Sequence, residues 1–142
     1  MSHVARTDLD LARVLLVDDD PTSRLTLKTV LEAGGYNVDS AASAAEAVSK
    51  LDKSVYELVL SDLQMESPQA GLKVLAHARM MEYKPATALI TTYLAETPKA
   101  SRHSNSLLIR PVDVPGLLGK VAYLISQRAT RRMERELRLA HA

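Results

Sequence analysis

The sequence predicts an α/β protein, a doubly wound parallel sheet with helices on both faces. The first observation is that short apolar or β-branched runs alternate along the chain with segments of helical periodicity, as in strands joined by crossover helices. The second is size and composition. The chain has 142 residues, of which 46% are hydrophobic and 25% charged, and this suits one domain with one core.

Five runs have the length and composition of strands. We expect strands at residues 14–19, 36–41, 56–62, 86–92 and 106–111, and helices at residues 21–33, 44–53, 70–82 and 114–127. Asp20 precedes Pro21, a pairing typical of a helix N-cap and first helical residue. Ser43 and Glu46 have the spacing of a capping box, so they should begin the second helix.

The segment between the last two strands is short and polar. Residues 94–105 offer only Leu94, Ala95 and Ala100 to bury a helix. Short helices with so little apolar surface are marginal in water. We therefore expect a degenerate fourth helix here.

The composition excludes several classes of function. The chain has no cysteine, which rules out disulfides and thiolate sites and is compatible with the cytoplasm. Its 18 basic and 17 acidic residues give a net charge of +1, so we expect no direct binding of nucleic acid by the domain and no membrane association. The first residues lack the apolar core of a secretory signal, and no apolar run reaches the length of a membrane span.

Carboxylates stand at the carboxyl ends of two of the predicted strands. Asp18 and Asp19 end the first strand and Asp62 ends the third. The carboxyl ends of parallel strands meet at one edge of a sheet, so these side chains should form one acidic pocket. Clustered carboxylates repel one another, and a hard cation such as Mg²⁺ relieves the repulsion. No glycine-rich nucleotide motif is present, which favours a site for metal and a phosphoryl group.

Four motifs in combination resemble the receiver domains of two-component response regulators. They are VLLVDDDP, LVLSDLQM, ALITTY and LLIRP. The resemblance covers residues 12–127 and implies the flavodoxin-like receiver fold, with five strands in the order 2-1-3-4-5. It divides the chain into an N-terminal extension at residues 1–11, the receiver domain at residues 12–127, and an arginine-rich, helical C-terminal extension at residues 128–142.

The resemblance also implies a function in bacterial signalling. Asp62 would accept a phosphoryl group from a histidine kinase or phosphotransfer protein in a Mg²⁺-dependent reaction. Asp19 would bind the metal directly and Asp18 through water, with Asp62 and the backbone carbonyl of Gln64 completing the protein's ligands. Transfer would be only to the chain itself, so we do not expect a turnover enzyme.

Two further positions would complete the phosphoryl site. The resemblance gives Thr91 the hydroxyl that bonds the phosphoryl group, and it places Arg110 where the family has lysine. Movement of Thr91 would couple phosphorylation to the surface of the last strands and helix. Arginine keeps the positive charge of lysine but presents it as a planar fork of different reach.

Departures from the family pattern support an alternative. Arg110 replaces lysine, Glu66 stands where proline usually follows Met65, and Gly71 lies one residue later than expected. Glu66 is either a negative charge near the site or a solvent-facing loop residue. The alternative function is a pseudo-receiver that acts in protein interaction or dimerisation without phosphorylation. A third hypothesis, a Mg²⁺-dependent phosphohydrolase, would read Asp18 and Asp20 as a D-x-D motif.

The C-terminal segment carries five arginines and two glutamates among residues 127–142. Apolar residues recur there at helical spacing, at Ala129, Met133, Leu137 and Ala140. This pattern is consistent with an exposed extension of the last helix, with a coiled coil that joins two copies in a homodimer, or with a linker to an output domain. The segment is too short for the pattern to decide.

Overall fold

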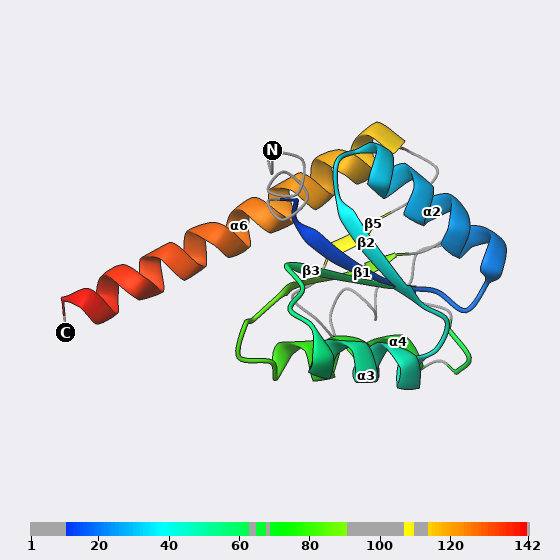
Figure 1. Ribbon diagram of the computed structural model, residues 1–142, viewed down its shortest axis with the longest axis horizontal. Helices are drawn as coiled ribbons and strands as arrows, with labels where there is room; N and C mark the ends of the chain where they lie inside the picture. Colours follow the sequence, from blue (N-terminus) through cyan, green and yellow to red (C-terminus); the bar gives the residue numbers. More distant parts are fainter. Residues whose placement is uncertain (1–10, 63–64, 68, 91–106, 110–113, 142) are drawn as a thin grey trace, which may run out of the picture.

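The computed structural model describes residues 11–62, 65–67, 69–90, 107–109 and 114–141. The elements in chain order, shown in Figure 1, are β1 (Arg13–Val17), α2 (Pro21–Ala33), β2 (Asn37–Ala41), α3 (Ala44–Lys53), β3 (Leu58–Asp62), α4 (Ala70–Arg79), β4 (Ala86–Ile90), β5 (Leu107–Ile109) and α6 (Val114–Ala140). The degenerate helix predicted at residues 94–105 lies outside the described residues.

The strands form one parallel sheet in the order β2-β1-β3-β4-β5. β2 lies on one side of β1 and β3 on the other, so the strand order reverses between the carboxyl ends of β1 and β3. In open sheets of this kind, ligands bind in the crevice at such a switch point. The prediction of a parallel α/β sheet is confirmed, and its topology places the candidate site.

Two layers of helices cover the sheet, α2 and α6 on one face and α3 and α4 on the other (Figure 1). Successive strand residues point to opposite faces, so β1 contributes to two apolar clusters. Val14 and Leu16 pack in the cluster that also holds Leu117 of α6. Leu15 and Val17 pack in the second cluster with residues of α3 and α4.

The predicted helix starts at Asp20 and Ser43 are confirmed. A carboxylate oxygen of Asp20 accepts a hydrogen bond of 2.8 Å from the backbone N–H of Ser23, and Pro21 is the first residue of α2. The hydroxyl of Ser43 accepts from the N–H of Glu46 at 3.1 Å. The carboxylate of Glu46 accepts in return from Ala42, one residue before the cap.

α4 ends three residues earlier than residue 82, its predicted end, because the chain turns between this helix and β4. Lys84 adopts the left-handed conformation, with φ at 45°. Pro85 follows it, and the residue before a proline is disfavoured in a right-handed helix. The ammonium of Lys84 donates to the carbonyl of Arg79 at 2.9 Å, which satisfies an orphan carbonyl of the last turn.

α6 continues well beyond the sheet (Figure 1). Its buried residues are Leu117, Val121, Leu124 and Arg128, and every residue from 129 to 141 is exposed. None of the described helices combines the length and apolar character that crossing a membrane requires.

Candidate functional site

The structure brings together the aspartates at the carboxyl ends of β1 and β3. Val17 and Ser61 are register partners in the parallel pair, so Asp18, which follows β1, and Asp62, which ends β3, lie side by side. Asp18, Asp19 and Asp62 each offer a carboxylate oxygen, and these three atoms all lie within 4.8 Å of one another. The expected acidic pocket is therefore present at the switch point of the sheet.

The three carboxylates differ in exposure. Asp18 is 1% exposed and Asp62 is 5% exposed, whereas Asp19 lies at the surface. Two buried carboxylates thus stand behind one that faces solvent. This arrangement lets a small ion or a phosphoryl group reach the cluster from the side of Asp19.

The two carboxylate oxygens of Asp18 differ in their hydrogen bonding to the described residues. Oδ1 accepts a hydrogen bond of 2.9 Å from the backbone N–H of Asp20. Oδ2 is buried and has no hydrogen-bond donor among the described residues. The carboxyl groups of Asp18 and Asp62 can bond directly only when they share a proton, because two carboxylates have no donor between them.

The environment of Asp18 opposes its ionisation. Burial raises the pKa of Asp18, and the negative charges of Asp19 and Asp20 raise it further. The hydrogen bonds with the Asp20 backbone and with Asp62 act in the opposite direction but are outweighed. A buried carboxylate oxygen without a donor, beside two more carboxylates, is the environment in which a cation is stabilising.

These oxygens fit a hard divalent cation. Mg²⁺ prefers oxygen ligands, retains several waters, and binds through one or two carboxylates together with a phosphate. Asp18, Asp19 and Asp62 could hold such an ion, and the orphaned Oδ2 of Asp18 is the specific observation that supports the fit. Gln64, whose carbonyl was predicted as a further ligand, lies outside the described residues.

Arg24 stabilises the acidic turn, a role that the sequence analysis missed. Its guanidinium donates to the backbone carbonyl of Asp18 at 2.8 Å, while the N–H of Asp18 donates to Ala41 of β2 at 3.0 Å. Hydrogen bonds from Ser23 lower the pKa of Asp20, and the charge of Arg24 lowers it further. A cation one helical turn after consecutive aspartates was the only signal in the sequence.

Gly71 supports the end of β3 from the other side. A Cβ atom at this position would lie 2.5 Å from the backbone oxygen of Asp62 and 3.3 Å from the hydroxyl of Ser61. Only glycine allows the first turn of α4 to approach the strand this closely. The residue that departs by one position from the family pattern therefore contacts the backbone of the candidate acceptor.

Glu66 has a structural partner. The side chain is exposed, and its carboxylate accepts a hydrogen bond of 3.2 Å from the backbone N–H of Ala44, the first residue of α3. A carboxylate is favourable at a helix N-terminus because the N–H groups there are unpaired and carry partial positive charge. Glu66 is thus more than a solvent-facing residue, since it connects the loop after β3 to α3.

The remaining predicted site residues, Thr91 and Arg110, lie outside the described residues. The roles of these two residues stay predictions.

Comparison with known sequences identifies relatives of this chain. The sequence model of the response regulator receiver domain matches residues 14–105. An uncharacterised 14.6 kDa protein of Leptolyngbya boryana is 35% identical over 105 residues, which cover 70% of this chain and 79% of that protein. The transcriptional regulatory protein GlrR of Escherichia coli is 30% identical over 127 residues, which cover 87% of this chain but only 28% of GlrR.

A gliding motility regulatory protein of Myxococcus xanthus is 38% identical over 78 residues, 55% of this chain and 10% of that protein. The chain thus spans well under a third of two of these relatives, GlrR and the gliding motility protein.

Solved structures agree with the sequence comparison. The response regulator protein TrrA of Thermotoga maritima, solved in complex with Mg²⁺ and BeF, is 30% identical with a TM-score of 0.69, covering 80% of this chain and 99% of that one. A CheY-like receiver domain protein of Methanospirillum hungatei has a TM-score of 0.75 at 24% identity, covering 86% of this chain and 99% of that one, and shows the shared fold. On the match of its family model and on this fold, the chain belongs to the response regulator receiver domains.

Proposed function

We propose that this receiver domain accepts a phosphoryl group on Asp62 from a histidine kinase or a phosphotransfer protein, in a Mg²⁺-dependent reaction, and relays it through a conformational switch. The observation that carries the proposal is the cluster of Asp18, Asp19 and Asp62 at the switch point, where a buried oxygen of Asp18 has no donor in the part of the chain that the structure describes. The related TrrA, which was solved in complex with Mg²⁺ and BeF, supports binding of Mg²⁺ by this chain.

The reaction is a displacement at phosphorus by a carboxylate nucleophile. An oxygen of Asp62 forms a bond to the phosphorus atom, the bond from phosphorus to the histidine nitrogen of the donor breaks, and its electron pair returns to the imidazole. The product is an acyl phosphate on Asp62. The chain transfers the group only to itself, so it is a signalling module rather than a turnover enzyme.

Asp18, Asp19 and Asp62, with the backbone carbonyl of Gln64, are the residues that would hold Mg²⁺. When bound, the ion supplies positive charge that offsets the carboxylates and the phosphoryl oxygens. The remaining roles belong to Thr91, whose hydroxyl would bond the phosphoryl group, and to Arg110, whose guanidinium would offset its charge. Thr91 directly follows β4, so its movement would shift the population of arrangements at that edge of the sheet.

The proposal extends to location and assembly. We propose a cytoplasmic location, with which the absence of cysteine is compatible. A homodimer through the exposed stripe of Ala129, Met133, Leu137 and Ala140 on α6 is part of the proposal, with a linker to an output domain as the other use of this helix. No direct contact of the domain with nucleic acid or membrane is proposed.

The test is phosphorylation by a small donor. The protein is incubated with Mg²⁺ and acetyl phosphate, and its intact mass is measured beside that of Asp62→Asn. We expect a phosphate-sized mass gain in the wild type that is absent from the variant and from a sample with excess EDTA. A gain that persists in Asp62→Asn would refute the assignment of the acceptor.

The same experiment separates the alternative function. A pseudo-receiver, which the replacement of lysine by Arg110 favours, would gain no mass with acetyl phosphate or with a phosphorylated phosphotransfer protein. Mg²⁺ would then also fail to bind, as measured by titration calorimetry. That combined result would replace the phosphoacceptor function with a phosphorylation-independent interaction module.

A further inference from the structure

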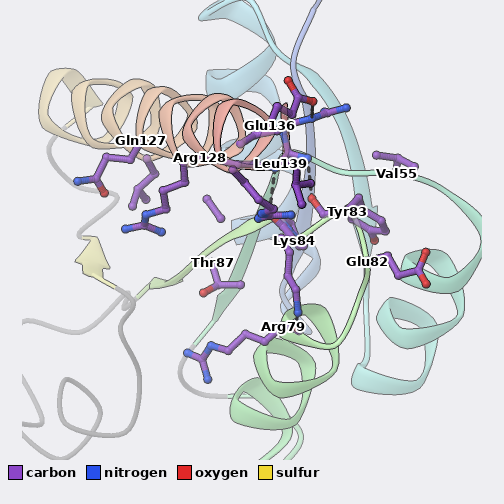
Figure 2. Close-up of a pocket in the computed structure, with 16 residues that line it drawn as sticks. Val55, Arg79, Glu82, Tyr83, Lys84, Thr87, Gln127, Arg128, Glu136 and Leu139 are labelled. Carbon is purple, nitrogen blue, oxygen red and sulfur yellow. Dashed lines mark hydrogen bonds and ion pairs between the residues drawn. The ribbon is translucent and has the colours of Figure 1, made fainter. Parts of the chain in front are cut away.

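A groove lies at the end of the sheet opposite the acidic site. Its floor includes Ala86 and Thr87, which begin β4, whereas Asp62 ends the neighbouring parallel strand. One wall is the turn between α4 and β4, residues 80–85, and the other is the second half of α6 (Figure 2). The groove has a volume of about 730 Å³, within the range of sites that bind ligands in proteins.

Arg128 holds the two walls together. Its side chain is 8% exposed, and its guanidinium donates to the carbonyl of Lys84 at 3.0 Å and to the carbonyl of Tyr83 at 2.7 Å (Figure 2). The hydroxyl of Tyr83 donates to the carbonyl of Leu51 in α3 at 3.0 Å, which fixes the turn from behind. The groove is therefore preformed, and a ligand need not order its walls on binding.

The side of α6 that faces the sheet changes from apolar to basic where the helix passes the turn between α4 and β4. Up to Arg128, the side of the helix that faces the sheet is apolar. Arg131, Arg132 and Arg135 continue that side at helical spacing and line the groove, with Leu139 one turn further. These arginines project into the space under the overhanging helix, on a different side from the exposed apolar stripe of α6.

The lining carries an excess of positive charge. Its cations are Arg79, Lys84, Arg128, Arg131, Arg132 and Arg135, and its carboxylates are Glu82 and Glu136. Arg132 and Glu136 form an ion pair of 3.6 Å, whereas Arg131 and Arg135 make no ion pair with any residue that the structure describes. Burial lowers the pKa of Arg128, Glu57 raises it, and the neighbouring charges of Arg132 and Arg135 lower it further. The positive field in the groove is therefore only partly neutralised.

We propose that this groove binds an extended acidic segment of a partner protein, with its carboxylates against Arg131 and Arg135. Guanidinium groups match carboxylates in a planar, bidentate geometry. Leu124 and Leu139 line the groove along α6 and offer apolar contacts at either end. At 1.5 Å per residue they stand about 22 Å apart along the helix, the length of roughly seven extended residues.

The shape of the groove favours a peptide over other polyanions. The arginines face a concave space between a helix and a turn, which a slender chain can enter and a planar membrane or a stiff duplex cannot. Single-stranded nucleic acid normally requires aromatic stacking platforms, and Tyr83 is the one aromatic residue among the described residues that line the groove. The proposal concerns a different surface from the phosphoacceptor site and does not depend on phosphorylation.

The test measures binding of a defined probe by fluorescence anisotropy. The probe is a fluorescein-labelled peptide of about eight residues, rich in glutamate with a leucine near each end to match the groove. Its counterpart has glutamine at every glutamate. The proteins are the wild type, Arg131→Glu/Arg135→Glu, Asp62→Asn, and Arg138→Glu as a control on the same helix outside the groove lining. Circular dichroism verifies that each variant remains folded.

We expect the wild type and Asp62→Asn to bind the acidic peptide and to bind the glutamine counterpart at least roughly tenfold more weakly. Arg131→Glu/Arg135→Glu should lose binding, while Arg138→Glu should retain it within about twofold. Absence of binding to the wild type would overturn the proposal. Equal losses in the two arginine variants would also overturn it, because they would indicate unspecific attraction. Tighter binding of a labelled single-stranded oligonucleotide than of the peptide would overturn it in favour of nucleic acid.

Discussion

Asp18 and Asp62 end up as buried neighbours because Val17 of β1 and Ser61 of β3 are register partners in a parallel pair. The register thus places two carboxylates next to each other at the edge of the sheet, and burial raises the pKa of Asp18. Oδ2 of Asp18 has no hydrogen-bond donor among the described residues, so ionisation of Asp18 leaves a buried negative charge without a donor from that part of the chain. The burial of this carboxylate should therefore affect both the stability of the fold and its response to Mg²⁺.

Mg²⁺ should stabilise the folded protein, because the unfolded chain has no such cluster of carboxylates. At a Mg²⁺ concentration of 100 times the dissociation constant, the free energy of unfolding should rise by about 2.7 kcal/mol. Asp18→Asn should raise the thermal midpoint by a few degrees without Mg²⁺, since it removes a buried charge, and it should abolish most of the response to Mg²⁺. Thermal unfolding followed by circular dichroism measures both effects.

The matched control is Glu134→Gln, which removes an exposed carboxylate on α6 far along the chain from the cluster. It should leave the response to Mg²⁺ unchanged at constant ionic strength. If the wild type and Asp18→Asn respond equally to Mg²⁺, the ion does not bind through Asp18.

Substitution of Gly71 should disturb the acceptor strand. In Gly71→Ala the new Cβ atom would start 2.5 Å from the backbone oxygen of Asp62, which forces α4 and β3 apart. Overpacking of this kind costs about 1–3 kcal/mol of stability. Displacement of Asp62 should also slow the gain of mass with acetyl phosphate. Chemical denaturation measures the loss of stability, and intact mass measurement over time gives the rate of phosphorylation.

Gly119→Ala is the control for the replacement of a glycine by alanine at a position without a close contact. Gly119 lies inside α6 with open space where a Cβ atom would be placed. Alanine is the better helix former, so this variant should be more stable by about 0.5–1 kcal/mol. A Gly71→Ala variant as stable as the wild type would show that the close contact to Asp62 relaxes without cost.

The convergence of the acidic side chains was predictable because it depends on two local facts. Each aspartate follows an apolar run of strand length, and parallel strands end at the same edge of a sheet. Neither fact depends on the conformation of a loop. The capping roles of Asp20 and Ser43 were predictable for the same reason, since each cap bonds to a residue three positions along the chain.

The missed contacts depend on loop shape. Glu66 reaches Ala44 across 22 positions of sequence, and nothing in the local pattern of the loop indicates that partner. Arg128 was placed at the start of an exposed extension, yet it is buried against the turn that precedes β4. A charged residue is buried only where acceptors are in place, and the carbonyls of Tyr83 and Lys84 are in place because Lys84 adopts a positive φ. The sequence does not reveal that conformation.

Arg128 should contribute strongly to stability. Arg128→Met keeps an aliphatic side chain of similar length but removes both hydrogen bonds to the carbonyls of Tyr83 and Lys84. Hydrogen bonds from a charged donor are worth about 1.5–3 kcal/mol, so we expect a loss in this range by chemical denaturation. Arg138→Met, at an exposed position on the same helix, should change stability by less than about 0.5 kcal/mol. Similar losses in the two variants would contradict the anchoring role of Arg128.

The apolar stripe on α6 should control self-association. Met133 and Leu137 are 61% and 55% exposed on the helix beyond the sheet, a state that burial in a homodimer would relieve. Light scattering coupled to size exclusion should show a dimer fraction that grows with wild-type concentration and disappears in Met133→Glu/Leu137→Glu. Leu25→Glu, which changes a leucine on α2 that is 67% exposed, should leave the dimer intact because it lies on a different element. A wild type that stays monomeric at every concentration would eliminate the homodimer and favour the alternative, in which α6 is a linker to an output domain.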